Sequence, residues 1–238
     1  MKVFLAGASG VIGRRLVPLL RAAGHAVIGT TRSLDKAAAI AALGATPVVV
    51  NVFSATAVAR AVQKTAPHVI IHQLTDLPSA PGTPGYEAGL ERNARLRIDG
   101  TRNLVAAAKA MGIKRMIAQS IAFVYAPGDG ARRESDPLDL AATGARKLTV
   151  EGVVALEGAT LELPQGIVLR YGLLYGPGTW FEREKRGAPA LHVDAAAQAA
   201  VLALTRAKHG IYNIAEDDGA VSSDKAKRDF GFDAGFRI

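Results

Sequence analysis

The sequence predicts an α/β protein built on a doubly wound parallel sheet of about seven strands, with a small, reduced lobe at its C-terminal end. Two observations predict this class. Short apolar runs without polar alternation, which are typical of strands buried on both faces, alternate with helical patterns throughout the first half of the chain. Three closely spaced glycines then join the first such run to the first helix, as a tight turn from strand to helix requires.

These glycines stand at positions 7, 10 and 13, directly after the N-terminal apolar run. Gly7 allows a sharp turn off the strand, Gly10 lets backbone N–H groups approach a pyrophosphate, and Gly13 lets the helix pack closely on the sheet. An ordinary glycine turn between core elements is the alternative. We predict that this turn binds the diphosphate of a dinucleotide, through Gly7, Ser9, Gly10, Val11, Ile12 and Gly13.

Composition indicates one globular unit with a minor lobe, because 49% of the 238 residues are hydrophobic and only 21% are charged. The absence of cysteine excludes disulfides and thiolate metal sites, and it is consistent with a cytoplasmic location. Residues 37–59 carry no charge, but Gly44, Pro47 and Asn51 interrupt them, so we expect no membrane span. No secretory signal is expected either.

The formal net charge of +8 raises the question of a nucleic-acid partner. The basic residues are scattered in pairs, and aromatic residues make up only 5% of the chain, which leaves few side chains for stacking on bases. A solvated surface and an anionic small ligand explain the charge more simply. We expect a small-molecule substrate and no nucleic acid.

The remaining elements follow in chain order. Strands are expected at 25–31, 45–50 (buried), 68–75, 113–119 and 210–215, and helices after Ser33 as N-cap and at 58–65, 86–111 and 138–157. Residues 77–86 are rich in proline and glycine, and they follow the fourth strand at the edge where open α/β sheets bind ligands. We therefore expect a substrate-side loop there.

The end of the second strand predicts which dinucleotide is bound. An acidic residue about twenty positions past the glycines holds the ribose hydroxyls of NAD, but Arg32 stands at this place. A guanidinium suits a 2′-phosphate, so we predict that NADP(H) is preferred and that NAD(H) is possible. A solvent-facing arginine at a strand end is the alternative interpretation.

Several further motifs resemble those of one family. They are residues 100–104 (Gly-Thr-Arg-Asn-Leu), 112–115, Ser120 with Val124-Tyr125, 169–178 and 192–194. With the GxxGxxG spacing, they resemble the extended branch of the short-chain dehydrogenase/reductase superfamily, the NAD-dependent epimerase/dehydratase family. The resemblance covers nearly the whole chain. It implies a Rossmann-type NAD(P)-binding domain at 1–171, and substrate-lobe segments at 172–238 interleaved with the last Rossmann helix and strand.

The resemblance also implies a set of cofactor contacts. Asn51 and Val52 would lie at the adenine, and Lys147 would hold the nicotinamide ribose. The end of the fourth strand would lie under the second ribose. These additional implied contacts are Gln73, Leu74, Thr75 and Tyr171. We expect His72 to be a core histidine without a catalytic role, and we expect no metal site.

Enzymes of this family use a tyrosine and a lysine four residues apart, but none of the five tyrosines here is followed by lysine at that spacing. Thr143 stands at the tyrosine position and Lys147 at the lysine position. Ser120, or Ile121 in another register, stands near the family's catalytic hydroxyl. Tyr125, Tyr171 or Tyr175 could supply a phenol from another direction. The resemblance therefore implies Ser120, Lys147 and Tyr125 as catalytic candidates.

Two function classes follow from this altered set. The first is an NAD(P)-dependent oxidoreductase or epimerase/dehydratase-like enzyme acting on a carbonyl, alcohol or sugar-nucleotide type substrate. The second is a non-catalytic NADP(H)-binding sensor or regulatory protein. The resemblance further implies a homodimer. Residues 182–188 and 219–224 are short for the family, which indicates either a reduced substrate lobe or absent loop residues.

Overall fold

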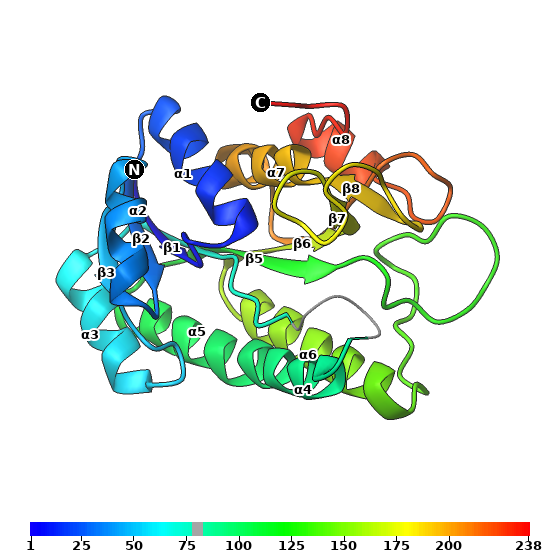
Figure 1. Cartoon of the computed structure of the whole chain (residues 1–238), viewed down its shortest axis with the longest axis horizontal. Helices are drawn as coiled ribbons and strands as arrows, with labels where there is room; N and C mark the ends of the chain where they lie inside the picture. Colours follow the sequence, from blue (N-terminus) through cyan, green and yellow to red (C-terminus); the bar gives the residue numbers. More distant parts are fainter. Residues whose placement is uncertain (78–82) are drawn as a thin grey trace.

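The computed structural model describes residues 1–77 and 83–238, and it is organised around a parallel sheet of seven strands (Figure 1). Their spatial order is β3-β2-β1-β4-β5-β6-β9. Because the order reverses between β1 and β4, this is the point where an open α/β sheet binds ligands. The bounds are β1 Lys2–Ala6, β2 Ala26–Thr31, β3 Thr46–Val49, β4 Val69–His72, β5 Arg115–Ile121, β6 Gln165–Tyr171 and β9 Gly210–Ile214.

Helices cover both faces of the sheet (Figure 1). One layer holds α1 Val11–Ala22, α2 Ala37–Ala42, α7 Val193–Arg206 and α8 Asp224–Phe230, and the other holds α3 Ala55–Thr65, α4 Tyr86–Arg95, α5 Thr101–Ala110 and α6 Gly144–Leu161. The strands alternate their side chains between the two layers, so Val3 and Leu5 of β1 enter one apolar core while Phe4 and Ala6 enter the other. The doubly wound class predicted from the sequence is confirmed.

A π-helical segment, Leu96–Gly100, joins α4 to α5, so the single helix predicted at 86–111 is continuous but not uniform. A π turn contains an extra residue, which changes the direction of the side chains around it, and such turns are frequent at functional sites. Arg97 lies within this segment and is buried.

Three predicted elements differ from the structure. The third strand was expected to be buried, but β3 is an edge strand, and Val49 remains 48% exposed. The fourth strand, predicted at 68–75, ends at His72, although the N–H of Gln73 still donates to the carbonyl of Ala6 at 2.8 Å. The helix expected at 138–157 spans Gly144–Leu161 instead, and Leu138 pairs with Tyr125 in an isolated bridge.

Ser33 precedes a short 3-10 turn, Leu34–Lys36, and makes no side-chain capping hydrogen bond. Half of the loop predicted at 77–86, residues 78–82, lies outside the described residues. No helix in the described part of the chain is long and apolar enough to cross a membrane. The described residues also include no cluster of three or more His, Asp or Glu side chains that could hold a metal ion.

The C-terminal part of the chain contributes to the main sheet and to a separate two-stranded sheet. β7 Leu173–Tyr175 pairs in parallel with β8 Ala190–His192, whereas α7 and β9 complete the main fold. Arg15 of α1 donates a hydrogen bond from Nε to Asp194 of α7 at 2.7 Å and another to the carbonyl of Pro177 at 2.7 Å. These contacts fix the small sheet beside the N-terminal end of α1.

Candidate functional site

The glycine turn after β1 is a place where three backbone segments approach one another more closely than side chains would allow. Gly7 has φ of +97°, and a Cβ there would lie 2.7 Å from the carbonyl oxygen of Gln73. A Cβ on Gly13 would lie 2.2 Å from the carbonyl oxygen of Gly7. Helix α1 therefore begins directly against the turn, as the sequence predicted for a closely packed helix.

The N-terminal end of α1 is also left without a negative partner from the chain itself. Gly10 is the N-cap and has no side chain, and the first turn contains no acidic residue. The first N–H groups of a helix have no intrahelical acceptor, and the helix dipole places partial positive charge there. This exposed backbone fits a diphosphate and could hold one through the predicted segment at residues 7–13.

A narrow apolar cavity lies beside the ends of β2 and β3, where an adenosine group would be placed by the fold. Val52 lines this cavity, and its carbonyl accepts a hydrogen bond from Asn103 Nδ2 at 2.8 Å. Asn51 is exposed and is not part of the lining; its Oδ1 accepts from the N–H of Phe53. The structure therefore brings Val52, but not the Asn51 side chain, to the cavity.

Arg32 lies at the rim of the same cavity. Its side chain is 55% exposed, and Nη1 lies 3.6 Å from Oδ2 of Asp76, a residue that also faces Arg92 at 3.8 Å. Two guanidinium groups thus converge on one carboxylate at this end of the groove. Neither ion pair is short, and both arginines remain accessible to an anionic group.

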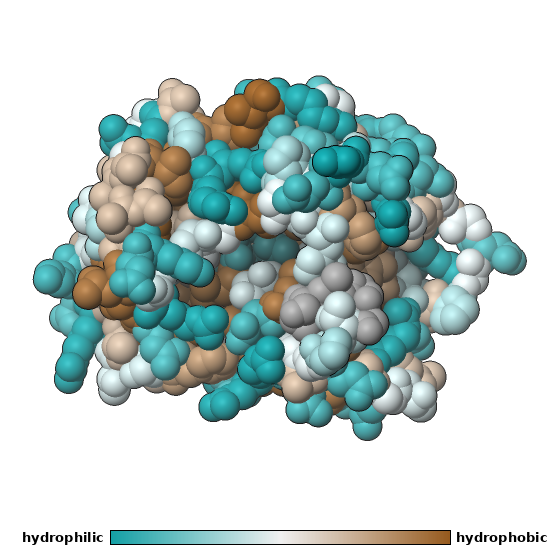
Figure 2. Space-filling model, in the orientation of Figure 1, coloured by the Kyte–Doolittle hydropathy of each residue, from teal (hydrophilic) through white to brown (hydrophobic). Residues whose placement is uncertain are grey.

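A second, larger cavity of about 470 Å³ lies next to the first, and Thr75 lines both of them. Its wall is mainly aliphatic and aromatic, and the space-filling view shows that this face of the molecule is hollowed between the two helical layers (Figure 2). The apolar lining includes Val11, Leu77, Leu90, Ile121, Phe123, Leu173, Leu174 and Trp180. The described lining contains no carboxyl, imidazole or lysine side chain.

Ser120 and Tyr125, two of the predicted catalytic residues, do not line this cavity but belong to a buried polar network. Ser120 Oγ donates to Glu157 Oε1 at 2.7 Å, and Arg170 donates to both oxygens of the same carboxylate, at 2.8 and 2.6 Å. Tyr125 donates to Asn213 Oδ1 at 2.6 Å and accepts from Arg170 at 2.8 Å. Burial raises the pKa of Tyr125, so its phenol is a poor acid.

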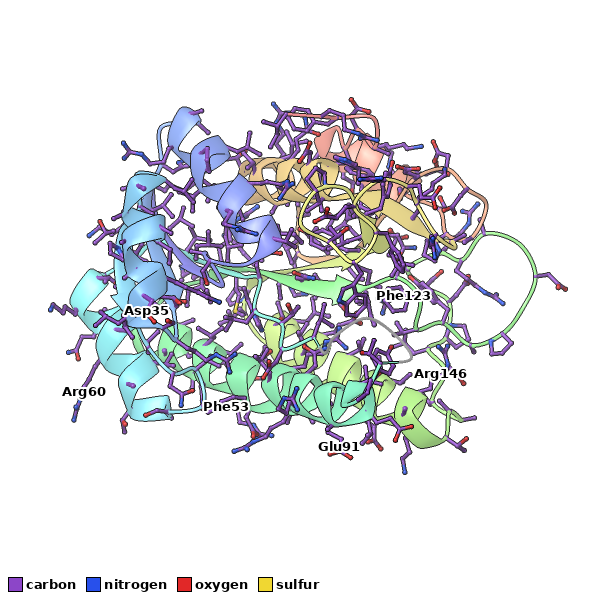
Figure 3. All side chains as sticks on the ribbon, in the orientation of Figure 1. Asp35, Phe53, Arg60, Glu91, Phe123 and Arg146 are labelled. Carbon is purple, nitrogen blue, oxygen red and sulfur yellow. The ribbon has the colours of Figure 1, made fainter. Side chains whose placement is uncertain are left out.

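Lys147, the third candidate, also lies outside the cavity lining. Its side chain is 60% exposed, and its Nζ lies 3.7 Å from Glu151 one helical turn further along α6. Arg146 and Thr149 line the cavity instead, because α6 begins at Gly144 and this register turns Lys147 away. Figure 3 shows Arg146 and Phe123 on the same side of the molecule, and Arg146 Nη1 donates to the carbonyl of Phe123 at 3.2 Å.

Tyr171 and Gln73 lie between the glycine turn and the large cavity. Tyr171 lines the cavity, but its hydroxyl donates to the carbonyl of Ala196 at 3.0 Å and accepts from Gln73 Nε2 at 3.4 Å. Burial raises the pKa of Tyr171 well above that of an ordinary phenol. Gln73 Oε1 is buried and has no hydrogen-bond partner among the described residues, so an acceptor is left for a ligand.

Sequence reasoning missed the face of the long helix that forms one wall of the cavity. Tyr86, Leu90, Asn93 and Arg97 line the cavity, and their spacing of three to four residues is that of one helix face. Glu91 points away from this wall to solvent in Figure 3. The helical spacing was visible in the sequence, but nothing in the sequence showed that this face lies over a cavity.

The fold and the paired cavities define a dinucleotide-binding protein of the Rossmann type. Residues 7–158 match the family model described as NAD(P)H-binding, and the chain belongs to this family. A 3-diazoavenalumate denitrifying reductase from a Streptomyces species is 38% identical over 242 residues, which cover 92% of this chain and 77% of the relative.

Solved structures share the fold at low sequence identity. The UDP-glucose 4-epimerase of Thermus thermophilus, in complex with NAD, has a TM-score of 0.76 at 18% identity, covering 100% of this chain and 95% of that one. The UDP-glucose 4-epimerase of Thermotoga maritima, with UDP-glucose, has a TM-score of 0.79 at 16% identity, covering 100% and 94%. The predicted resemblance to the extended short-chain dehydrogenase/reductases is thereby confirmed at the level of the fold.

The close approach at Gly13 predicts a large effect of one added methyl group. Gly13→Ala should lower the free energy of unfolding by about 1–3 kcal/mol, because its Cβ would overlap rigid backbone at 2.2 Å rather than a flexible side chain. Urea unfolding followed by circular dichroism measures this change.

Gly158→Ala is the matched control, since Gly158 also lies within a helix but a Cβ there meets nothing within 4 Å. This variant should gain about 0.5–1 kcal/mol from the better helix propensity of alanine. If the two substitutions changed the free energy of unfolding equally, the contact between α1 and the glycine turn would not exclude a side chain at position 13.

Proposed function

We propose that this protein is an NADPH-dependent reductase that acts on a planar, mainly apolar, electron-poor small molecule. The observation that carries the proposal is the large apolar cavity, which adjoins the dinucleotide groove through Thr75 and whose described lining has no carboxyl, imidazole or lysine side chain. When bound, the reduced nicotinamide supplies a hydride. The residues of the chain bind and orient the substrate and exclude water from it.

The character of the wall supports an apolar substrate over a sugar nucleotide. A sugar ring and its diphosphate present many hydroxyl and phosphate oxygens, each of which requires a partner when it is buried. Leu90, Ile121 and Phe123 cannot supply such partners, but they pack well against a flat hydrocarbon or aromatic group. We therefore favour an aromatic or conjugated substrate.

The substrate class is further limited by proton transfer. Reduction of a carbonyl requires a proton on oxygen. The family's tyrosine is replaced by Thr143, Tyr125 and Tyr171 are held as poor acids, and Tyr86 is the one phenol of the described lining besides Tyr171. An aryl diazonium ion has no such requirement, because Ar–N2⁺ and hydride give Ar–H and N2 without a proton. The denitrifying reductase to which the chain is 38% identical is named for a diazo compound, which supports this class.

We further propose that Arg32 makes NADPH the preferred reductant. Arg32 follows β2 at the rim of the adenosine-side cavity, and its present partner Asp76 holds it only at 3.6 Å. Arg92 adds a second positive charge at the same place. A 2′-phosphate bound here could pair with both guanidinium groups. Among the described residues, these two groups share a single carboxylate, that of Asp76.

Replacement of this arginine tests the cofactor preference. Arg32→Ala should weaken NADPH binding by about 10- to 100-fold, because a charge-assisted hydrogen bond to phosphate contributes roughly 1.5–3 kcal/mol. Binding of NADH should change little, since it has no 2′-phosphate. Calorimetric titration of both nucleotides measures the effect, and Arg60→Ala, on the outer part of α3 (Figure 3), is a control of equal charge. Equal losses for both nucleotides would contradict the assignment.

Isotope transfer tests the reaction itself. With NADPH deuterated at C4, incubation with a benzenediazonium carboxylate should give the arene carrying one deuterium and release N2, as measured by mass spectrometry above a control without protein. An aryl aldehyde and UDP-glucose, under the same conditions, should react little. Tight binding of NADPH without turnover of any of these compounds would contradict a reductase and favour a non-catalytic sensor.

Two further proposals concern the setting in which the protein acts. We propose a homodimer formed through the outer faces of the long helix and α6, where Val154 is 42% exposed, and sedimentation velocity distinguishes it from a 24.8 kDa monomer. A sedimentation profile of monomers at all concentrations would contradict the homodimer.

A cytoplasmic location is proposed from the lack of cysteine and the use of a reduced dinucleotide.

A further inference from the structure

The polar interior between α6 and the long helix carries an unbalanced positive charge. It contains Arg97, Arg170 and one carboxylate, Glu157, all of them at least 95% buried. Glu157 is fully engaged by two hydrogen bonds from Arg170 and one from Ser120. Arg97 makes no hydrogen bond or ion pair with any described residue. Its charge is therefore left without a direct partner.

Among the described residues, the other group that interacts electrostatically with Arg97 is His72, which does not remove this imbalance. Burial and the charge of Arg97 lower the pKa of His72 to about 4, so this histidine is neutral near pH 7 and adds no charge. Its Nδ1 accepts a hydrogen bond from the N–H of Leu74. The proton of the neutral ring is therefore on Nε2, which donates to Thr101 Oγ1. Burial lowers the pKa of Arg97 to about 10, although the nearby charge of Glu157 acts in the opposite direction, and the guanidinium stays charged near pH 7. An anion bound in the cavity would stabilise this largely buried charge.

The position of Arg97 shows where that anion would come from. Arg97 lines the large cavity from the π-helical segment, and it is only 5% exposed. Arg146, the other arginine in the described lining, is already held by Asp139 and by the backbone carbonyls of Phe123 and Tyr125. Only Arg97 among the described charged residues of the lining is therefore free to bind a ligand.

We propose that Arg97 binds a carboxylate group of the substrate, so that the substrate of this protein is a planar apolar acid. The proposal rests on the proposed function, because it assumes that the large cavity receives the substrate. The apolar wall accommodates the hydrocarbon part, while the planar guanidinium matches a carboxylate through two parallel N–H···O bonds. The same ligand would neutralise the buried positive charge.

A matched pair of probes tests this without turnover. Binding of trans-cinnamate and of its neutral amide, trans-cinnamamide, is measured with NADP⁺ present, by calorimetry and by quenching of Trp180, the only tryptophan of the chain, which lines the cavity. The carboxylate should bind about 10- to 100-fold more tightly than the amide. Arg97→Met should abolish this preference and leave the affinity for the amide unchanged.

Two further variants act as controls. Arg146→Met removes the other arginine of the wall and should keep the preference for the carboxylate. If Arg97→Met does not fold, Arg97→Lys carries the test: it keeps the charge but loses the two-bond geometry, and it should lower the affinity for cinnamate alone. Thermal unfolding without ligand shows whether each variant is folded.

The outcomes separate this inference from the proposed function. Equal binding of the two probes to the wild-type protein, absence of binding of both, or a preference that survives in Arg97→Met would each overturn the role of Arg97, even if hydride transfer is observed. A preference that depends on Arg97, in a protein that reduces none of the tested compounds, would support the carboxylate site and contradict the reductase.

Discussion

The contact on which the rest of the structure depends is the one between the backbone of the glycine turn, the first turn of α1 and the end of β4. Three segments meet there with no room for a Cβ on Gly7 or Gly13. This contact places the N–H groups of α1 at the edge of the sheet where the strand order reverses. It also fixes the path of residues 73–75, and Thr75 then separates the cavity on the adenosine side from the larger one.

The charges inside the molecule form a second level of organisation. Although burial opposes its charge, hydrogen bonding to Glu157 raises the pKa of Arg170, and the resulting pair connects β6 to α6 behind the cavity. Ser120 and Tyr125 belong to this structural pair rather than to the wall of the cavity. Because these groups are paired among themselves, the cavity is lined mainly by apolar side chains, with neutral polar groups and the guanidinium of Arg97 among them.

Some of the site could be predicted because it depends on local sequence. The roles of Gly7 and Gly13 follow from the absence of a side chain, and the position of Arg32 follows from the end of a strand, so both were visible in the residue pattern. The side of α6 that faces the cavity was not predictable in this way. With α6 starting at Gly144, Arg146 faces the cavity, while Lys147 lies outside the lining and is largely exposed.

The sequence by itself determined the alternation of strands and helices, the glycine turn and the absence of a Tyr-x-x-x-Lys pair, because each of these depends on residues close together in the chain. The tertiary structure alone decided which polar groups meet. Ser120, Glu157 and Arg170 are far apart in sequence, and only the packing of α6 on β5 and β6 joins them and leaves Arg97 without a carboxylate. Whether a buried charge is balanced depends on its distances to other charges in the folded protein, and these distances cannot be read from the local sequence.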